Sequence, residues 1–356
     1  MLKVAVIGAG NAGQALAGYM ASQGCEVRIS ELNPAIVEVL RKKRKIHLSG
    51  CLDICGMLAQ VETDAAKIVA GANVIMVATT AVAHAALARQ LASELEDDQV
   101  IILNPGRTGG VLEFRKTLQE CGCTKRLYIA EAQTLVYACR LKDTGEVNII
   151  GIKDKVLLCA LPASDTKHVL DVISPLYSCF KPCKNVLETS LENYGAVFHP
   201  SVVLFNAAAI ERGNGFYFYR EMTPKIAEFI ERLDAERIAL GKAYGINLIS
   251  AKDWVSEAYD GIEGDTLCER MRNNPAYYDI LAPTMIDCRQ LTEDIPTGAV
   301  PFVALGKAAG LEMPIYSSII GMAEALLNRD FHTTGRSLKN LGLEGLTKED
   351  ILKKLA

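Results

Sequence analysis

His199 differs from the other four histidines of the chain. It lies in the segment Phe198-His199-Pro200, which interrupts an apolar helical stretch, whereas His47 and His332 lie in polar surroundings. Imidazole gains and loses a proton near neutral pH, so a histidine placed in this way can serve as a general acid or base. The commoner explanation is a core histidine with satisfied hydrogen bonds, and the residues alone leave both explanations open.

A cation and an acid follow in residues 289–296. Arg289 and Asp294 lie five positions apart, ahead of an apolar run that ends at Leu305. A cation at such a place can hold a substrate carboxylate. A segment of this kind is more often a capped helix start with solvated charges, so the pattern by itself does not decide the role of either residue.

The strongest single motif spans residues 4–13, with the sequence VAVIGAGNAG. Gly8 permits a tight strand-to-helix turn, Gly10 lets the backbone approach a pyrophosphate, and Gly13 allows the helix to pack closely on the strand. Asn11 and Ala12 start the helix, whose N-terminus faces the phosphate charge. Three glycines are weak evidence alone, but this set follows an apolar strand and precedes a helix of small residues. We therefore expect these five residues to bind a dinucleotide.

The expected second strand, residues 26–30, ends at Glu31. An acid here accepts hydrogen bonds from both ribose hydroxyls and repels a 2′-phosphate, which favours NAD over NADP. Arg28 and the basic helix end at residues 41–45 could bind a 2′-phosphate, so NADP remains an alternative cofactor. Glu31 could also be an ordinary exposed acid at the end of a strand, without a role in binding. Thr79, Thr80 and Asn104 follow the next two strands at the sheet edge where ligands of open parallel sheets bind.

The elements that must position these residues divide the chain in two. In the first half, β-branched runs alternate with helical patterns, which predicts an α/β fold with a parallel sheet covered on both faces and an antiparallel extension after it. The strands are expected at 3–7, 26–30, 74–78, 100–103, 127–130, 147–152 and 156–161, and the helices at 12–23, 34–43, 81–95, 110–120 and 166–176. Beyond the loop at 175–182 the pattern is helical throughout. We expect a dinucleotide-binding domain over residues 1–185 and an all-α domain over residues 186–356.

Composition narrows the class of protein further. A net charge of −4 argues against binding to nucleic acid or to an anionic membrane. The eleven cysteines are scattered, and no pair has zinc-like spacing, so we expect buried thiols in a reducing compartment, no metal site and a cytoplasmic protein. The apolar stretch at 68–88 is broken by polar residues and glycine, and no segment is expected to span a membrane.

Several motifs in one order over essentially the whole chain resemble the octopine/nopaline dehydrogenase family, the opine dehydrogenases, and especially its bacterial N-(1-carboxyethyl) amino acid dehydrogenases. They are IILNPG at 101–106, ACR at 138–140, NYGAVFHP at 193–200, NAA at 206–208, DAER at 234–237, NPAY at 274–277, RQLTEDIP at 289–296, GRSL at 335–338 and LGL at 341–343. The resemblance implies a Rossmann-type domain joined to a helical domain of the 6-phosphogluconate dehydrogenase type. It also allows a homodimer.

The resemblance also implies an activity and the residues that carry it. An amino acid and a 2-oxo acid such as pyruvate would form an imine, which NAD(P)H reduces to an N-(carboxyalkyl) amino acid. His199 matches the general acid/base, Asp294 the acid that orients it, and Arg289 the arginine that binds the 2-oxo acid carboxylate. Arg107 could hold the amino acid's carboxylate and Glu131 its ammonium or a basic side chain, although each could equally be an exposed charge.

Two other classes of protein remain. Ketopantoate reductases and glycerol-3-phosphate dehydrogenases also join a Rossmann domain to helices, but they use a lysine as proton donor, and no lysine lies in the segments of His199 and Arg289. A non-catalytic NAD sensor could keep the fold. Such a sensor would need none of His199, Asp294 and Arg289.

Overall fold

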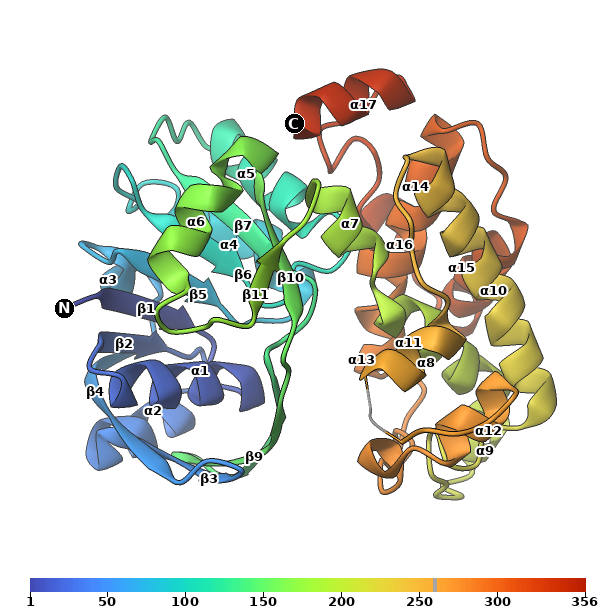
Figure 1. Cartoon of the computed structure of the whole chain (residues 1–356), viewed down its shortest axis with the longest axis horizontal. Coiled ribbons are helices and arrows are strands. Elements are labelled where there is room, and N and C mark those ends of the chain that lie inside the picture. Colours follow the sequence, from blue (N-terminus) through green and yellow to red (C-terminus); the bar gives the residue numbers. More distant parts are fainter. Residues whose placement is uncertain (259–260) are drawn as a thin grey trace. The chain divides into compact units, whose positions relative to one another are not determined.

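The computed structural model describes residues 1–258 and 261–356. The chain forms two compact units, which are described separately. Unit 1 comprises Met1–Ser190 with Lys354–Ala356, and unit 2 comprises Leu191–Lys353. The predicted class, an α/β Rossmann-type half followed by an all-helical half, is confirmed (Figure 1). That residues 1–185 and 186–356 fold as independent domains stays a prediction.

Unit 1 is built on one sheet, which has eleven strands among the described residues, in the order β11-β10-β7-β6-β5-β1-β2-β4-β3-β9-β8. Six neighbouring strands, β7 to β4 in this order, run parallel, whereas β10 is antiparallel to β7. The strands are β1 Lys3–Ile7, β2 Glu26–Ser30, β3 Lys45–Gly50, β4 Ile54–Glu62, β5 Val74–Val77, β6 Val100–Leu103, β7 Tyr128–Ala132, β8 Tyr137–Asp143, β9 Glu146–Ile152, β10 Val156–Leu161 and β11 Phe180–Pro182.

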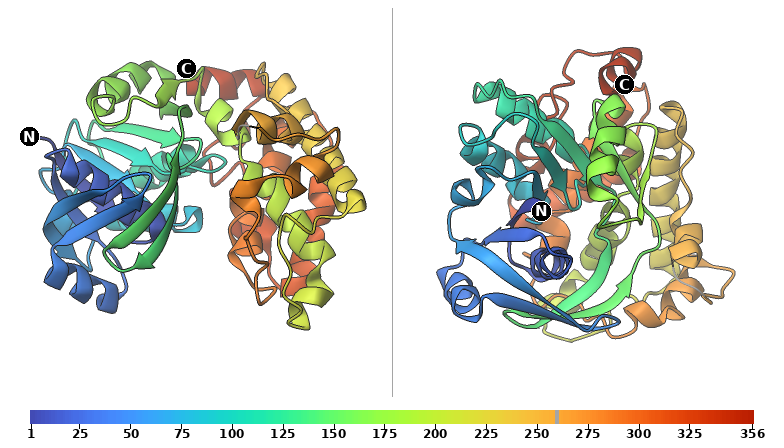
Figure 2. Two further views of the ribbon diagram at one scale, coloured as in Figure 1. Left: turned by 60° about the horizontal axis from the view of Figure 1, so that its bottom comes forward. Right: turned by 60° about the vertical axis from the view of Figure 1, so that its left-hand side comes forward.

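Helices cover this sheet. They are α1 Asn11–Ser22, α2 Pro34–Lys43, α3 Ala66–Val69, η1 Ala81–Ala83, α4 His84–Leu91, α5 Gly110–Glu120, η2 Ala163–Asp165, α6 Thr166–Ile173 and α7 Val186–Leu191. Strands β3, β9 and β8 curl beside α1 (Figure 2), and Gly18 of α1 lies directly against the β3 side chains Ile46 and Leu48.

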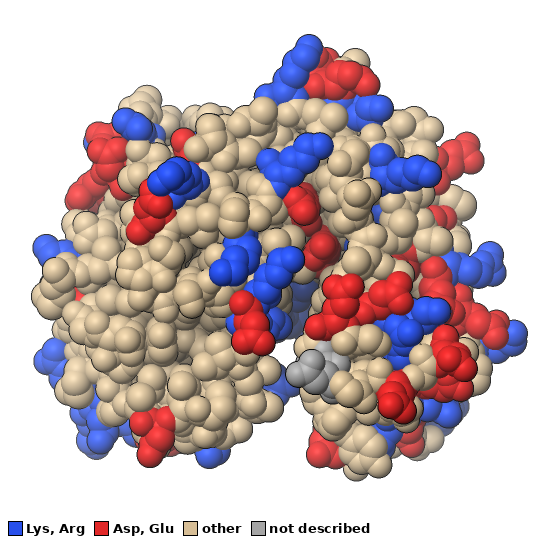
Figure 3. Space-filling view, viewed as in Figure 1, with Lys and Arg blue, Asp and Glu red and all other residues tan. Residues whose placement is uncertain are grey.

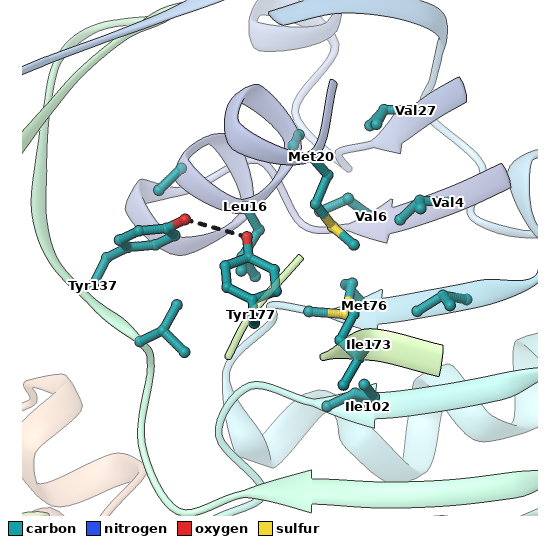
Figure 4. Packing of buried hydrophobic residues seen from close by; sticks show 14 of the residues in the cluster. Val4, Val6, Leu16, Met20, Val27, Met76, Ile102, Tyr137, Ile173 and Tyr177 are labelled. Carbon is teal, nitrogen blue, oxygen red and sulfur yellow. Dashed lines mark hydrogen bonds between the residues drawn. The ribbon is translucent and has the colours of Figure 1, made fainter. Parts of the chain in front are cut away.

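One part of the unit 1 core lies between the sheet and α1. Val4, Val6, Leu16 and Met20 belong to one buried cluster, and the phenols of Tyr137 and Tyr177 form a hydrogen bond of 3.3 Å at its edge (Figure 4). Burial raises the pKa of both phenols, so they remain neutral.

Unit 2 is helical. Its elements are α8 Tyr194–Phe205, α9 Ala207–Glu211, α10 Pro224–Ala243, α11 Ala251–Ala258, α12 Leu267–Arg272, η3 Pro275–Tyr277, α13 Arg289–Thr292, η4 Ile295–Ala299, α14 Val300–Ala308, α15 Pro314–Leu327, α16 Phe331–Thr334 and α17 Lys348–Leu355, the last of which ends in unit 1. α10 begins with the Thr223 hydroxyl accepting the Ile226 N–H and with Pro224 in the first turn, a pairing of cap and proline typical of helix starts. Buried Arg237 ties this helix to its surroundings by donating to Asp234 and to the carbonyls of Leu191 and Ile249.

Some sequence-based expectations were incomplete or wrong. β3, β4, β8 and β11 were not predicted, and the helix expected at 81–95 is the short η1 followed by α4, which ends at Leu91. The cysteines are not all buried, because Cys51, Cys55 and Cys121 are exposed. Cys55 occupies an outward-facing position of β4, Cys51 lies in the turn before that strand, and Cys121 lies at the end of α5.

Three further properties complete the description. Lysine and arginine side chains lie interspersed with aspartate and glutamate on the face drawn in Figure 3. None of the helices in the described ranges combines the length and apolar character that a membrane span needs. No group of three or more His, Cys, Asp or Glu side chains within those ranges is arranged to hold a metal ion.

Candidate functional site

The glycine motif forms the turn between β1 and α1. Gly8 has φ +96°, a conformation that favours glycine, and a Cβ on Gly13 would lie 1.7 Å from the Gly8 carbonyl oxygen. Gly10 is the residue before the helix, and a Cβ there would meet no atom within 4 Å. Gly8 and Gly13 therefore fix the fold of the turn, while Gly10 keeps open the approach to the helix N-terminus that a phosphate needs.

Glu31 lies against this turn. Its carboxylate accepts the Ala9 N–H at 2.9 Å and the Asn33 N–H at 3.1 Å. The side chain that was predicted to bind ribose is thus held next to the glycine-rich backbone, from the neighbouring strand β2. A carboxylate fixed here disfavours a second negative charge beside it.

Two other polar residues of α1 hold the turn in place. The Asn11 side-chain oxygen accepts the Leu141 N–H at 2.7 Å, so this side chain joins α1 to β8. Gln14, which the sequence analysis missed, is buried, donates to the Ala9 carbonyl at 2.7 Å and accepts the Gly145 N–H at 2.7 Å. The sequence signal that could have identified Gln14 is an amide side chain within the apolar part of a predicted helix. Ala12 is half-buried in the first turn.

Thr79, Thr80 and Asn104 lie where expected, just beyond the carboxyl ends of β5 and β6. The Thr79 hydroxyl and the Asn104 side-chain oxygen are buried and make no hydrogen bond with the described part of the chain, whereas Thr80 is exposed. Buried polar atoms normally have partners. Together with the open approach at Gly10 and the carboxylate of Glu31, these two oxygens fit a dinucleotide along this edge.

Glu131 requires a correction. We predicted that its carboxylate holds a substrate's ammonium group or a basic side chain, but it is fully buried within unit 1. One oxygen accepts the hydroxyls of Thr189 and Ser190 at 2.7 and 2.8 Å, and the other accepts the Val111 N–H at the start of α5 at 2.9 Å. A carboxylate in this position stabilises the N-terminus of α5, which gives the acid near the end of β7 a structural role. Arg107 lies in the preceding loop, half-buried, with φ +58°.

In unit 2, His199 and Asp294 are brought together. His199 Nδ1 lies 2.7 Å from Asp294 Oδ2. The histidine side chain is 27% exposed and that of Asp294 only 2%, so the imidazole is accessible while the acid behind it is buried. This is the arrangement in which a carboxylate fixes the tautomer of a histidine and stabilises its protonated form.

Local sequence explains why the pair is so close. His199 lies on α8, and Asp294 immediately precedes the π-helical turn η4, in which the Ala299 N–H donates to the Asp294 carbonyl. A Cβ on Gly298 would lie 2.5 Å from the Ala196 Cβ, so only glycine lets η4 approach α8 this closely. Single π-helical turns of this kind often occur at functional sites.

Arg289 is not hydrogen-bonded to either member of the pair. Its side chain is 63% exposed, and its Nε donates to Glu293, whose side chain is almost fully buried. Its two terminal nitrogens donate no hydrogen bond to the described residues. A buried acid thus anchors the guanidinium and leaves the outer edge of its fork available to a carboxylate.

Tyr219 was missed as an individual residue. Its hydroxyl lies 3.0 Å from His199 Nε2. The sequence at 216–220 contains four aromatic residues, but nothing in it indicates which ring reaches the histidine. Thus both ring nitrogens of His199 have a polar partner, one acidic and one phenolic.

Both halves of the chain are similar to known proteins. Residues 182–327 match the family model described as "NAD/NADP octopine/nopaline dehydrogenase, alpha-helical domain", and residues 3–116 match "NAD-dependent glycerol-3-phosphate dehydrogenase N-terminus". An opine dehydrogenase of Arthrobacter sp. (strain 1C) is 36% identical over 98% of this chain and 97% of its own length. The vitopine synthase of Allorhizobium ampelinum (strain ATCC BAA-846 / DSM 112012 / S4) is 26% identical over 97% of this chain and 96% of its own. A solved octopine dehydrogenase, in complex with NADH and agmatine, shares the fold with a TM-score of 0.84 at 22% identity, over 99% of this chain and 98% of that one.

Proposed function

The chain belongs to the opine dehydrogenase family, and we propose that it catalyses the NAD(P)H-dependent reductive condensation of an amino acid with a 2-oxo acid, pyruvate being the first choice. The observation that carries this proposal is the contact of 2.7 Å between His199 and buried Asp294. Octopine dehydrogenase has been solved with NADH and agmatine, with NADH and L-arginine, and with NADH and pyruvate, so its ligands include both substrate classes that the reaction joins.

The turn between β1 and α1 would hold the cofactor. Gly8, Gly10 and Gly13 would accommodate the pyrophosphate, with Asn11 and Ala12 contributing the backbone of the first helical turn. Glu31 would bind the adenosine ribose, and Thr79, Thr80 and Asn104 would line the rest of the edge. When bound, NAD(P)H supplies the hydride.

In unit 2, His199 holds the proton that the condensation needs. The amine and the 2-oxo acid first add to give a carbinolamine, and the imidazolium of His199 provides the proton with which its oxygen leaves as water. Asp294 keeps the imidazole oriented and stabilises its charge. General acid catalysis of this kind contributes on the order of 10²–10⁴ to a rate.

Two arginines would hold the carboxylates of the substrates. Arg289, anchored by Glu293, would bind the 2-oxo acid in the bidentate manner for which guanidinium is suited. Arg107 would bind the carboxylate of the amino acid. Because Glu131 is engaged inside unit 1, none of the site residues predicted from the sequence remains to bind the ammonium group of the amino acid.

A single assay tests the function. NADH oxidation is measured with pyruvate and each amino acid in turn, and the series is repeated with NADPH. We expect oxidation only when both substrates are present, and a faster reaction with NADH because of Glu31. Oxidation with a 2-oxo acid alone would instead indicate a simple reductase of the ketopantoate or glycerol-3-phosphate type.

We further propose that the enzyme works in the cytoplasm and as a homodimer. All eleven cysteines, each within the described ranges, carry free thiols, which suits a reducing compartment. Sedimentation of the purified protein tests the dimer. Separate expression of residues 1–185 and 186–356 tests whether these ranges are independent domains.

A further inference from the structure

The hydrogen bond between Tyr219 and His199 occupies the nitrogen with which the histidine would act. Nδ1 faces Asp294, so Nε2 is the nitrogen left to exchange a proton with a substrate. The Tyr219 hydroxyl lies 3.0 Å from Nε2. Each ring nitrogen directs one hydrogen or one lone pair in the plane of the ring. A substrate oxygen therefore cannot take the same position while the phenol is there.

Packing holds the phenol in place. Tyr219 is 7% exposed, and its ring stacks on Tyr277 with centroids 4.6 Å apart and planes 26° apart. Phe218 and Phe198 meet the ring edge-on at 4.8 and 6.3 Å. The adjacent backbone is paired, since the Phe218 N–H donates to the Ile280 carbonyl at 2.7 Å. Displacing this side chain would break contacts on several sides.

The hydroxyl group suits both protonation states of the histidine. The ionised Asp294 can only accept, so Nδ1 carries a proton and Nε2 of the neutral ring accepts the phenolic O–H. When the ring is protonated, Nε2–H donates to the phenolic oxygen, and the phenolic O–H is released to point toward another acceptor. A hydroxyl can donate and accept at once, which is the property that a proton relay needs.

We propose that Tyr219 is a catalytic residue of this enzyme and that its hydroxyl passes the proton between His199 and the substrate oxygen. The inference rests on the proposed function. In the dehydration step the Nε2–H bond breaks as a proton moves to the phenolic oxygen, and the phenolic proton moves to the carbinolamine oxygen. The C–O bond breaks with its electron pair on oxygen, water leaves, and the nitrogen lone pair forms the C=N bond. The positive charge of the imidazolium ends on the iminium nitrogen.

The first test replaces only the hydroxyl group. With pyruvate and the amino acid that the parent uses best, we expect Tyr219→Phe to lower kcat by on the order of 10²–10⁴. The KM for NADH and the Tm should stay unchanged, because the ring still packs on Tyr277. Tyr278→Phe is the matched control, since this neighbouring ring is 48% exposed, stacks on Arg220 and has no contact with His199. A Tyr219→Phe enzyme as active as the parent, or more active, would overturn the relay and leave His199 as the direct donor.

A second test separates proton transfer from positioning. Fluorinated tyrosine at position 219 keeps the ring and the hydroxyl but makes the O–H more acidic. If the proton passes through this oxygen, the pH profile of kcat shifts, whereas the same replacement at position 278 leaves it unchanged. An unaltered profile at position 219 overturns the relay. If the parent enzyme does not oxidise NADH with both substrates, the proposed function is wrong and the relay is wrong with it. If both the parent and the Tyr219→Phe variant are active, only the relay is wrong.

Discussion

His199 Nδ1 and Asp294 Oδ2 are 2.7 Å apart although 95 positions separate them in the chain. The buried acid and the accessible imidazole form a directional pair: the acid faces the interior of unit 2, and the second ring nitrogen faces the Tyr219 hydroxyl. This geometry, with the glycine turn of unit 1, leads to predictions for single residues.

Replacing Asp294 by asparagine should leave the fold intact and remove most of the activity. The amide can present its NH₂ group to Nδ1, which moves the proton of the neutral ring to Nε2 and removes the stabilising charge. We expect kcat to fall by about 10²–10⁴. NADH affinity, measured by fluorescence titration, should not change. Asp253→Asn, at an exposed acid bonded to Ser250 and Arg270, is the control and should keep parental kcat.

Arg289→Lys should weaken binding of the 2-oxo acid specifically. Lysine keeps the positive charge but loses the planar fork and the hydrogen bond from Nε to Glu293. We expect the KM for pyruvate to rise about 10- to 100-fold, equivalent to one or two charge-assisted hydrogen bonds. Steady-state kinetics with each substrate varied in turn measures this. Arg329→Lys, at an exposed pair with Asp287, should leave both KM values unchanged. Equal rises for pyruvate and the amino acid would argue against a dedicated 2-oxo acid site.

Glu31→Gln should change the choice of cofactor. The substitution keeps an oxygen that can accept the Ala9 N–H but removes the charge beside the expected 2′ position. We expect the ratio of kcat/KM for NADH to that for NADPH to fall on the order of tenfold. Glu94→Gln, at an exposed acid that accepts the Ser93 hydroxyl, is the control. An unchanged ratio would place the determinant elsewhere, with Arg28 and the basic end of α2 as the first alternatives.

The same added methyl group should weaken NADH binding at both Gly10 and Gly13 but lower the stability of the protein only at Gly13. A Cβ at Gly13 would overlap the Gly8 carbonyl oxygen at 1.7 Å, so Gly13→Ala should lower the Tm and abolish NADH binding. A Cβ at Gly10 meets no atom within 4 Å, so Gly10→Ala should keep the parental Tm. Its NADH affinity should nevertheless fall, because the methyl group lies where the pyrophosphate approaches. Thermal unfolding and NADH titration of both variants measure these effects. Normal NADH binding by Gly10→Ala would show that the pyrophosphate does not bind at this turn.

The sequence predicted the parts of the site that depend on local pattern. The glycine turn and Glu31 follow from strand and helix periodicity over about 30 residues, and the structure places the carboxylate beside the turn. Strands β3 and β4 escaped prediction because a lysine- and arginine-rich run hides the start of β3, and their apolar side chains find their partner in α1, far from them in sequence. Glu131 was misjudged because burial of an acid depends on distant donors, here Thr189 and Ser190. The same limitation concealed Tyr219, whose role depends on a contact across unit 2.

His47 should make folding stability depend on pH. Its ring is bonded to Asp53 and Glu146 at 2.9 Å each, and these two hydrogen bonds, the one with Asp53 foremost, raise the pKa of His47 above its usual 6.5. Because the raised value belongs to the folded state, the stabilisation is complete below the unfolded pKa and is lost as the pH rises through the folded one. His47→Gln should therefore lower the urea midpoint relative to the parent near pH 5.5, by about the small amount typical of exposed ion pairs. Near pH 9 it should have no effect. Added salt should reduce the difference, since these groups are exposed to water. A loss of stability that is equal at both pH values would show that packing of the ring, rather than its charge, accounts for the effect.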